Sequence, residues 1–514
     1  MITRRTLLST SVAGSAALLG MPFIGRAKAN SNTPVVDGRR VRRRLSTLSD
    51  DDPFFDAYNL AVERMAQEPD DSPLSWIAQG RLHADFCAHS RGSVDTNFFS
   101  WHRPYLESFE WICGELIGDP DFALPYWYWS DNSGRLPLPF FDRASLNIRN
   151  GNFDGDYVGI GWGPVSTTNY RHLEPALGLQ DTPFGGSHTE ANINRVLGTG
   201  QFRTLVGLVE GDLHGIPHVV TGGNPNFGLG TEIGHMSNGL SPLDPAFWMH
   251  HCMVDFIWAM SGIPVDDQLA AISNEDDFYE DMFVNADGSP RIVRVGDTFE
   301  MENLSFTYDT LVPELQSDDA AESEQIVAFA QSAILELAEA RGLVRAGAEG
   351  ERSLSEQVQP EAPVEFGLVN SIVVPTENLL DELYSDQLVP RRLSTGAIAF
   401  GVDSRRVYAE LSEVAVSNAG ASGAVKVFVD CPYLSRSTPT NDPHFAGNLS
   451  FFGCSPDTCG SKSFIVDVTE PLQHRLAQGA VPADVNIQLL PYDSEESPLG
   501  EAVAEVQSVR LILA

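Results

Sequence analysis

Apolar residues recur three and four positions apart over residues 53–116, which is the spacing of amphipathic helices. The stretch PFFDAYNLAVERMAQ (53–67) shows this pattern, and WHRPYLESFEWICGEL (101–116) repeats it. Pro104 lacks a backbone N–H, and proline is tolerated in the first turn of a helix. The second helix is therefore predicted to begin close to Pro104.

The helical pattern returns twice, at QFRTLVGLVEGDLHGIPHVV (201–220) and at DPAFWMHHCMVDFIWAMSG (244–262). Pro217 requires that a helix start near it. Residues 131–200 are rich in Gly, Pro and Asn and predict long loops. One more amphipathic helix is expected at 318–342, followed by a polar linker at 345–362.

From about residue 363 the pattern changes to short alternating runs, which are typical of strands. These runs are SIVVP, AIAFGV, VKVFVDC, KSFIVDV and VNIQLLP. The last third of the chain is therefore predicted to be an all-β domain.

The N-terminal stretch reads MITRRTLLSTSVAGSAALLGMPFIGRAKAN. Arg4 and Arg5 precede an apolar segment, and Ala27-Lys28-Ala29 fits a cleavage site of small residues. The pattern resembles a twin-arginine export signal, with an ordinary Sec signal as the alternative. Residues 1–29 predict an exported bacterial protein, periplasmic or secreted.

The chain carries 33 basic and 70 acidic residues, a net charge of −37. This balance argues against nucleic acid and anionic membranes as partners, and no later segment is apolar for the length of a membrane span. The one basic run, GRRVRRRL (38–45), is interpreted as a solvated strap on an acidic body. No feature predicts the oligomeric state.

Six of the twelve histidines fall into two groups of three within helical pattern. The first group is His83, His89 and His102, and the second is His214, His218 and His251. His214 and His218 are four residues apart, so they share one helix face and can bind one ion. Three imidazoles suit copper, zinc, iron or nickel, so ligand type alone does not name the metal.

Three stretches carry a resemblance to a known family. FFSWHRPYLESFE followed by LPYWYW, and later DPAFWMHHCMVD, resemble the two copper signatures of the tyrosinase, catechol oxidase (polyphenol oxidase) and molluscan haemocyanin family. The resemblance covers residues 43–311 and implies a four-helix bundle with two copper ions, each bound by three histidines. The spacing from His89 to His102 is longer than the family's, which points to an insertion.

The resemblance carries over to individual residues. It implies that His83, His89 and His102 bind one copper and that His214, His218 and His251 bind the other. His250 is then only a neighbour of His251.

Two further residues have counterparts in the family. Phe247 resembles the aromatic residue beneath the copper pair, with plain core as the alternative. Glu210 resembles a buried glutamate that orders a water in plant enzymes, with a solvated helix-start glutamate as the alternative. Gly215 stands where asparagine is common in enzymes that hydroxylate monophenols, so weak monophenolase activity is expected.

Cys87 stands in HADFCAHS, between His83 and His89. It can be read as a copper thiolate or as half of a disulfide, for which Cys113 and Cys252 are the nearest partners. The resemblance offers a third reading, because fungal tyrosinases and molluscan haemocyanins join a cysteine at this spacing to the histidine by a thioether. A Cys87–His89 cross-link is the expectation.

A second cysteine pair lies in the β region. Cys454 and Cys459 flank SPDT and suit a small disulfide loop.

These observations predict a mainly α copper domain, a four-helix bundle with long loops, followed by a C-terminal β-sandwich. The domain boundaries are 1–29 for the signal, 30–313 for the copper domain, 314–362 for helix and linker, and 363–514 for the β domain, a shield for the active site.

The expected activity is oxidation of o-diphenols to o-quinones by dioxygen, latent until the β domain is removed. The alternatives are a tyrosinase with monophenolase activity and a haemocyanin-like oxygen carrier. A zinc hydrolase is disfavoured because HGIPH lacks the glutamate of His-Glu-x-x-His.

Overall fold

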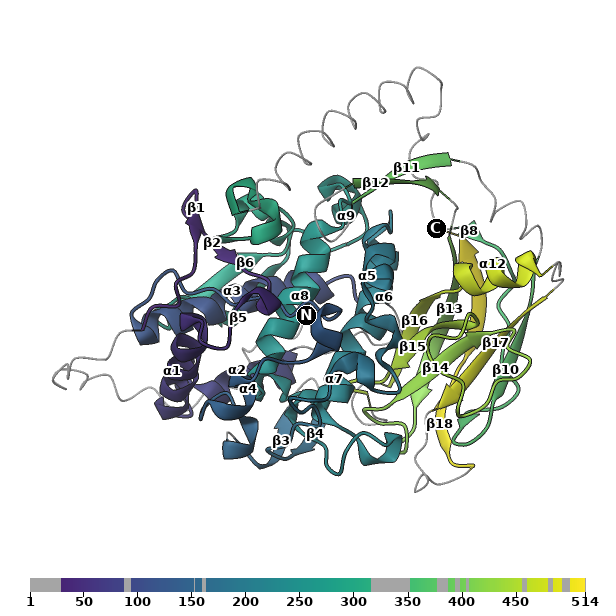
Figure 1. The fold of residues 1–514 in the computed structure, drawn as a ribbon, viewed down its shortest axis with the longest axis horizontal. Helices are drawn as coiled ribbons and strands as arrows, with labels where there is room; N and C mark the ends of the chain where they lie inside the picture. The colour runs from purple at the N-terminus through teal and green to yellow at the C-terminus, as the bar shows by residue number, and fades with distance from the viewer. Residues whose placement is uncertain are drawn as a thin grey trace, which may run out of the picture.

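A computed structural model shows a helical body beside a β body (Figure 1). It describes residues 29–86, 94–151, 153–159, 163–315, 352–376, 387–392, 398–403, 406–454, 460–478, 484–491 and 500–513. The helix expected at 318–342 lies outside these residues, as does nearly all of the expected export signal. The predicted division into an α domain and a C-terminal β domain is confirmed.

The helical body is built mainly from helices of two to five turns. They are α1 (Pro53–Gln67), α2 (Trp76–Phe86), α3 (Phe98–Ile117), α4 (Pro139–Asp142), α5 (Glu190–Leu197), α6 (Phe202–Leu208), the π-helix η7 (Val209–His214), α7 (Gly215–Gly222), α8 (Ala246–Met260) and α9 (Val265–Ala270). Asp52 caps α1 by accepting a hydrogen bond from the backbone N–H of Phe54 at 2.9 Å.

The start of α3 corrects one expectation. The helix begins at Phe98, six residues before Pro104, so the proline lies in its interior. Nearly every residue of α3 is buried, and this packing outweighs the one backbone hydrogen bond that proline removes. The other proline also lies inside helical structure, because α6 and the π-helix η7 lead without a break into α7, whose third residue is Pro217; the predicted helix start near Pro217 is wrong.

Short sheets brace the helical body. They are β1 (Val35–Val36), β2 (Arg39–Arg42) and β7 (Phe306–Tyr308) in one sheet, and the hairpins β3 (Gly155–Gly159) with β4 (Gly163–Thr167) and β5 (Phe278–Val284) with β6 (Pro290–Arg294). The expected solvated strap at 38–45 is wrong, because Arg42 is fully buried. Arg42 Nε lies 2.9 Å from Glu110 Oε1, and a buried guanidinium requires such a partner.

In its described residues, the β body consists of two main sheets and one helix. The first sheet has the order β10 (Asn370–Pro375), β17 (Asp484–Pro491), β14 (Ala424–Val429), β15 (Phe445–Ser450). The second has the order β8 (Arg352–Ser353), β19 (Ser508–Leu513), β13 (Val407–Val416), β18 (Ala502–Glu505), β9 (Val364–Glu365), with β16 (Ser461–Asp467) also paired to β13. A separate hairpin joins β11 (Gln387–Arg392) to β12 (Ile398–Asp403), and the helix is α12 (Thr469–Ala477). All five alternating runs of the sequence lie on strands.

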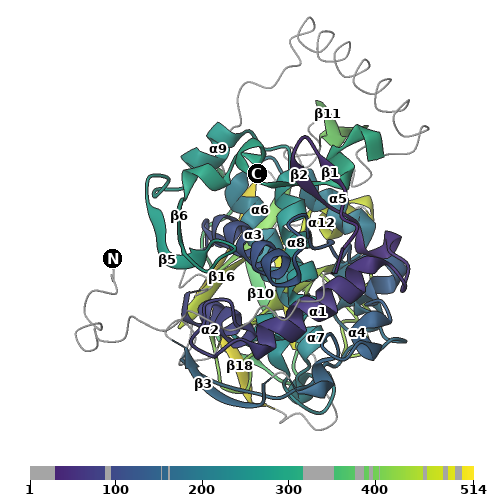
Figure 2. The same ribbon diagram turned by 90° about the vertical axis from the view of Figure 1, so that its left-hand side faces the viewer.

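The two bodies meet along a row of glycines four residues apart. Gly207, Gly211 and Gly215 lie on α6, η7 and α7, opposite β15 and β16 (Figure 1). A Cβ atom on Gly207 would lie 2.9 Å from Ile465, and one on Gly215 would lie 2.4 Å from the Ser450 hydroxyl. Figure 2, viewed from the helical side, shows the strands behind the helices. The glycines therefore let the β body rest directly on the helix that carries His214.

Candidate metal centre

Five of the six predicted histidines come together at the centre of the helical body. Helices α2, α3 and α8 supply His83, His102 and His251, and His214 and His218 stand at the junction of η7 and α7. All five are at most 2% exposed. The ring centre of His251 lies 4.3 Å from that of His102, in the first group, and 5.0 Å from that of His214, in its own group. His251 therefore connects the two groups. The sixth, His89, lies outside the described residues.

Backbone carbonyls orient four of these rings through Nδ1. His83 Nδ1 donates to Gly239 at 2.7 Å, His102 to Phe98 at 2.7 Å, His218 to Met236 at 2.8 Å and His214 to Glu210 at 3.3 Å. With the proton on Nδ1, each Nε2 keeps its lone pair for a metal. This is the tautomer expected of metal-binding imidazoles.

The distance between two Nε2 atoms tests whether an ion fits. His218 Nε2 lies 3.2 Å from His251 Nε2. Two nitrogens on one metal, each at about 2.0–2.1 Å, are separated by about this much at near-tetrahedral angles. The donor set and its spacing therefore fit a bound metal ion.

Burial favours the neutral form of three of these imidazoles, because it lowers their pKa. It lowers the pKa of His83 to about 3 and that of His102 to about 4. The pKa of His251 is also well below its ordinary value, first through burial and then through the neighbouring histidines. Neutral imidazole is the form that binds metal, so the cluster is ready for metal at neutral pH.

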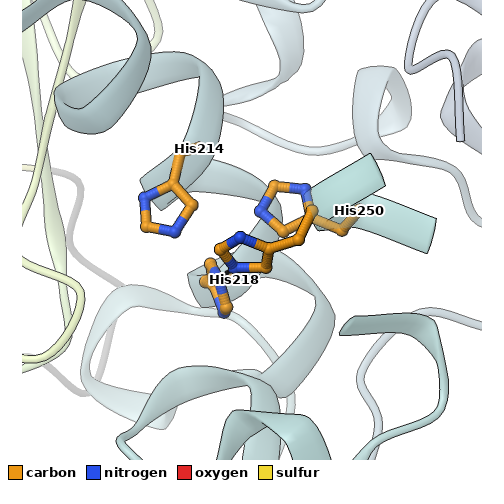
Figure 3. A group of neighbouring side chains, drawn as sticks. His214, His218 and His250 are labelled. Atoms are coloured by element: carbon orange, nitrogen blue, oxygen red, sulfur yellow. Dashed lines mark hydrogen bonds between the residues drawn. The ribbon is translucent and has the colours of Figure 1, made fainter. Parts of the chain in front are cut away.

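His250 joins one side of the cluster. Its ligand atom and those of His214, His218 and His251 all lie within 4.8 Å of one another. Figure 3 shows His214, His218 and His250 turned toward a common space. His250 packs on Trp129 at 5.3 Å, and its ring centre also lies 4.7 Å from that of His218 and 5.4 Å from that of His214. His251 contacts rings of both groups. The assignment of His251 as the ligand and His250 as its neighbour stays a prediction.

Phe247 lies beneath the cluster on α8. Its ring centre is 4.2 Å from that of His251, 5.2 Å from His83 and 5.8 Å from His218. It is fully buried. Phe247 therefore contacts imidazoles of both predicted groups, which plain core packing does not require.

A buried ion network, not anticipated from the sequence, joins the helices behind the histidines. Asp255 Oδ1 lies 2.6 Å from Arg103 Nε, and Asp255 Oδ2 lies 3.1 Å from Arg42 Nη1. Arg103 directly follows His102, and Asp255 lies one turn after His251. The network therefore holds a histidine of α3 and a histidine of α8 in register.

Glu210 is buried at 2% exposure, so the solvated alternative is wrong. Its Oε1 lies 3.3 Å from Lys462 Nζ of β16, and its Oε2 accepts the backbone N–H of Asp95 at 3.4 Å. Burial and then the charge of Glu210 raise the pKa of Asp95 to about 7. A residue of the β body therefore reaches a carboxylate one turn before His214.

Phe452, which follows β15, reaches the cluster from the β body. Its ring stacks on His218 with centres 3.7 Å apart and planes at 15°, and it meets His214 edge-on at 5.5 Å. It is 1% exposed. The sequence analysis did not identify Phe452 as a residue of the centre. The two consecutive phenylalanines at the end of the strand were the feature that could have pointed to it.

The cysteines limit the readings of Cys87, which itself lies outside the described residues. Cys113, Cys252 and Cys431 are free, so neither candidate partner is in a disulfide with Cys87. Cys454 is disulfide-bonded, and its partner lies outside the described residues. The cross-link remains a prediction.

The family model for the common central domain of tyrosinase matches residues 58–260, the segment that holds the five clustered histidines. This segment is therefore similar to the central domain of the tyrosinase family. This family binds a binuclear copper centre. In the parts that the structure describes, no helix has both the length and the apolarity needed to cross a membrane.

Plant members of the tyrosinase family are similar over half of the chain. Catechol oxidase B, chloroplastic, of Solanum tuberosum is 28% identical over 298 residues, which cover 52% of this chain and 49% of that protein. Polyphenol oxidase A, chloroplastic, of Solanum lycopersicum is 29% identical over 321 residues, 54% and 47% of the two chains. The chain thus spans about half the length of the curated relatives it matches.

The fold extends over nearly the whole chain. A latent apple tyrosinase superposes with a TM-score of 0.59 at 20% identity, covering 95% of this chain and all of the other. A latent aurone synthase gives 0.57 at 17% identity, covering 96% and 93%. The tyrosinase-family fold with its C-terminal β domain is therefore shared.

Proposed function

We propose that the protein is an exported copper oxidase that converts o-diphenols to o-quinones with dioxygen. The observation that carries the proposal is the cluster of five buried imidazoles, four of which are oriented through Nδ1 by backbone carbonyls. The moderate similarity to catechol oxidase B and polyphenol oxidase A supports the same substrate class. Export is proposed from the twin-arginine pattern at residues 1–29.

Two copper ions would be held by the two histidine groups. His83, His102 and His89 would bind one, and His214, His218 and His251 the other. When bound, the pair would supply the redox chemistry, in which two catechols give up four electrons and four protons to become two o-quinones and one dioxygen becomes two waters. Imidazole ligands suit both oxidation states of copper.

The protein's own residues would place the substrate. The face of His218 accommodates an aromatic ring, because Phe452 stacks on it at 3.7 Å. A catechol ring would take this position, with Phe247 supporting the imidazoles from below. Glu210 would accept the proton of a bound phenol through an ordered water.

The same contact supports latency. In the intact chain Phe452 occupies the place proposed for the substrate ring, so the β body shields the centre. Related folds occur in an apple tyrosinase and an aurone synthase that are described as latent. The later part of the predicted 345–362 linker pairs with β19 through β8, so it belongs to the β body. Cleavage before Arg352 followed by release of the β body would expose His218. Equal oxidation of catechol by intact and separated protein would contradict the shield.

Oxygen uptake with 4-methylcatechol tests the function. Copper-loaded protein freed of its β body should consume one dioxygen for two quinones formed. A haemocyanin-like carrier would bind oxygen reversibly and leave the catechol unchanged, and a tyrosinase in the strict sense would also hydroxylate 4-methylphenol rapidly without a lag.

The Cys87–His89 thioether is part of the proposal because it would fix a ligand on the segment before α3. The peptide that contains both residues should be lighter by two hydrogens and should resist thiol alkylation after reduction. A free, alkylatable Cys87 in fully active protein would contradict the cross-link.

A further inference from the structure

Lysine is scarce in this chain, and its placement is informative. Only Lys28, Lys426 and Lys462 occur among 33 basic residues. Lys426 on β14 and Lys462 on β16 are buried, at 4% and 2% exposure. Both side chains reach from the β body into the helical body. Arginine supplies nearly all other positive charge. Lysine differs from arginine in carrying a compact ammonium group on a flexible stem, which suits a narrow buried position.

Lys462 reaches Glu210. Its Nζ lies 3.3 Å from Oε1, and both side chains are 2% exposed. The second oxygen, Oε2, accepts the backbone N–H of Asp95 at 3.4 Å. The two oxygens of the carboxylate are therefore engaged by the protein while the β body is docked. A buried ion pair is held strongly, because separating its partners leaves an uncompensated charge.

A second contact from the β body lies beside the first. A Cβ atom on Gly215 would lie 2.4 Å from Ser450 Oγ. The hydroxyl of Ser450 thus fills the space that a side chain directly after His214 would need. The β body places polar groups at two positions that flank His214, Glu210 one turn before it and Gly215 directly after it.

We propose that Lys462 determines the substrate specificity of the docked enzyme by holding the Glu210 carboxylate away from phenols. The inference rests on the proposed function, in which Glu210 takes up a phenol's proton. A monophenol passes that proton to Glu210, and with one dioxygen it ends as o-quinone and water. A catechol loses its two protons together with its two electrons, and these protons end in the water formed from dioxygen. The Lys462–Glu210 pair therefore suppresses monophenol oxidation and spares catechol oxidation.

Kinetics in a Phe452→Ala background test this role, since that change opens the pocket while Lys462 stays docked. Lys462→Met removes the charge at similar volume, Lys462→Arg keeps it, and Lys426→Met is the matched control for losing a buried lysine of the same body. Oxygen uptake gives kcat and KM for 4-methylphenol and 4-methylcatechol, which differ by one hydroxyl.

Lys462→Met should raise the ratio of kcat for 4-methylphenol to kcat for 4-methylcatechol about a hundredfold, the lower end of the range that a positioned proton acceptor contributes. KM should stay unchanged, Lys462→Arg should keep the low ratio of the parent, and Lys426→Met should leave it unaltered. An unchanged ratio in Lys462→Met, or an equal rise in Lys426→Met, would overturn the proposal.

Nuclear magnetic resonance of copper-free protein labelled with ¹³Cε-lysine provides a readout that does not depend on turnover or on a folded Lys462 variant. So few lysines leave almost no overlap. Glu210→Gln should shift the Lys462 signal and leave the Lys426 signal in place. A Lys462 signal that does not respond to Glu210→Gln refutes the ion pair, whereas absent catechol turnover in copper-loaded protein freed of its β body refutes the proposed function.

Discussion

Replacing Phe452 with alanine should activate the intact protein. The ring stacks on His218 at 3.7 Å and is 1% exposed, so the substitution removes a fully buried aromatic side chain from the centre. Its backbone and the rest of the β body stay in place. The pocket over His218 then becomes available while the two bodies remain docked along the glycine row.

The size of the effect follows from the contact. Burying a phenylalanine side chain contributes about 1.5–3 kcal/mol, and an aromatic pair adds about 0.5–1.5 kcal/mol. A substrate that enters the parent must displace this ring, so the substitution should lower the cost of substrate binding by about 2–4.5 kcal/mol. At about 1.4 kcal/mol per factor of ten, turnover at low catechol concentration rises by about thirtyfold to a thousandfold.

Oxygen uptake with 4-methylcatechol measures the rise, with copper content determined on the same samples. Phe451→Ala is the matched control, because Phe451 is equally buried but packs edge-on against Phe464 at 5.8 Å inside the β body. Turnover should rise in Phe452→Ala and stay low in Phe451→Ala. Equal rates in both variants would refute the view that this one ring closes the site.

Three further results are expected. His251→Ala should lose copper from one site and abolish activity while His250→Ala keeps both ions, as metal analysis will show; the reverse pattern would exchange the assignment. Gly215→Asn should weaken docking of the β body, because the new side chain meets Ser450, and should raise hydroxylation of 4-methylphenol in protein freed of that body; unchanged docking would contradict the steric argument. Burial lowers the pKa of His235 to about 4, below its value of about 6.5 in the unfolded chain, so its contribution to stability is complete above pH 6.5 and is lost as the pH falls toward 4. Between pH 7 and 5, the unfolding free energy of the parent, measured by urea titration, should therefore fall by about 2 kcal/mol more than that of His235→Gln. Equal falls in the two proteins would refute the lowered pKa of His235.

The local sequence pattern was sufficient to predict most helices and strands and most histidines of the metal centre. Periodicity predicted the helices that carry His102, His214 and His251 and the strands of the β body, because spacing along one element decides which residues share a face. The histidine groups were recognisable because a metal needs particular donor types at spacings that one helix can present. The start of α3 was missed, since packing outweighed the local effect of Pro104.

Contacts between distant segments were decided only by the tertiary structure. Nothing local distinguishes Phe452 from Phe451, or Lys462 from Lys426, until β15 and β16 lie against α6 and η7 (Figure 1). The same holds for Arg42, which the sequence presents as part of a solvated basic run and the fold buries between Glu110 and Asp255. The charge or aromaticity of a side chain follows from its residue type. Whether that side chain stabilises the fold or blocks the centre depends on its partner, which lies on a segment far away in the sequence.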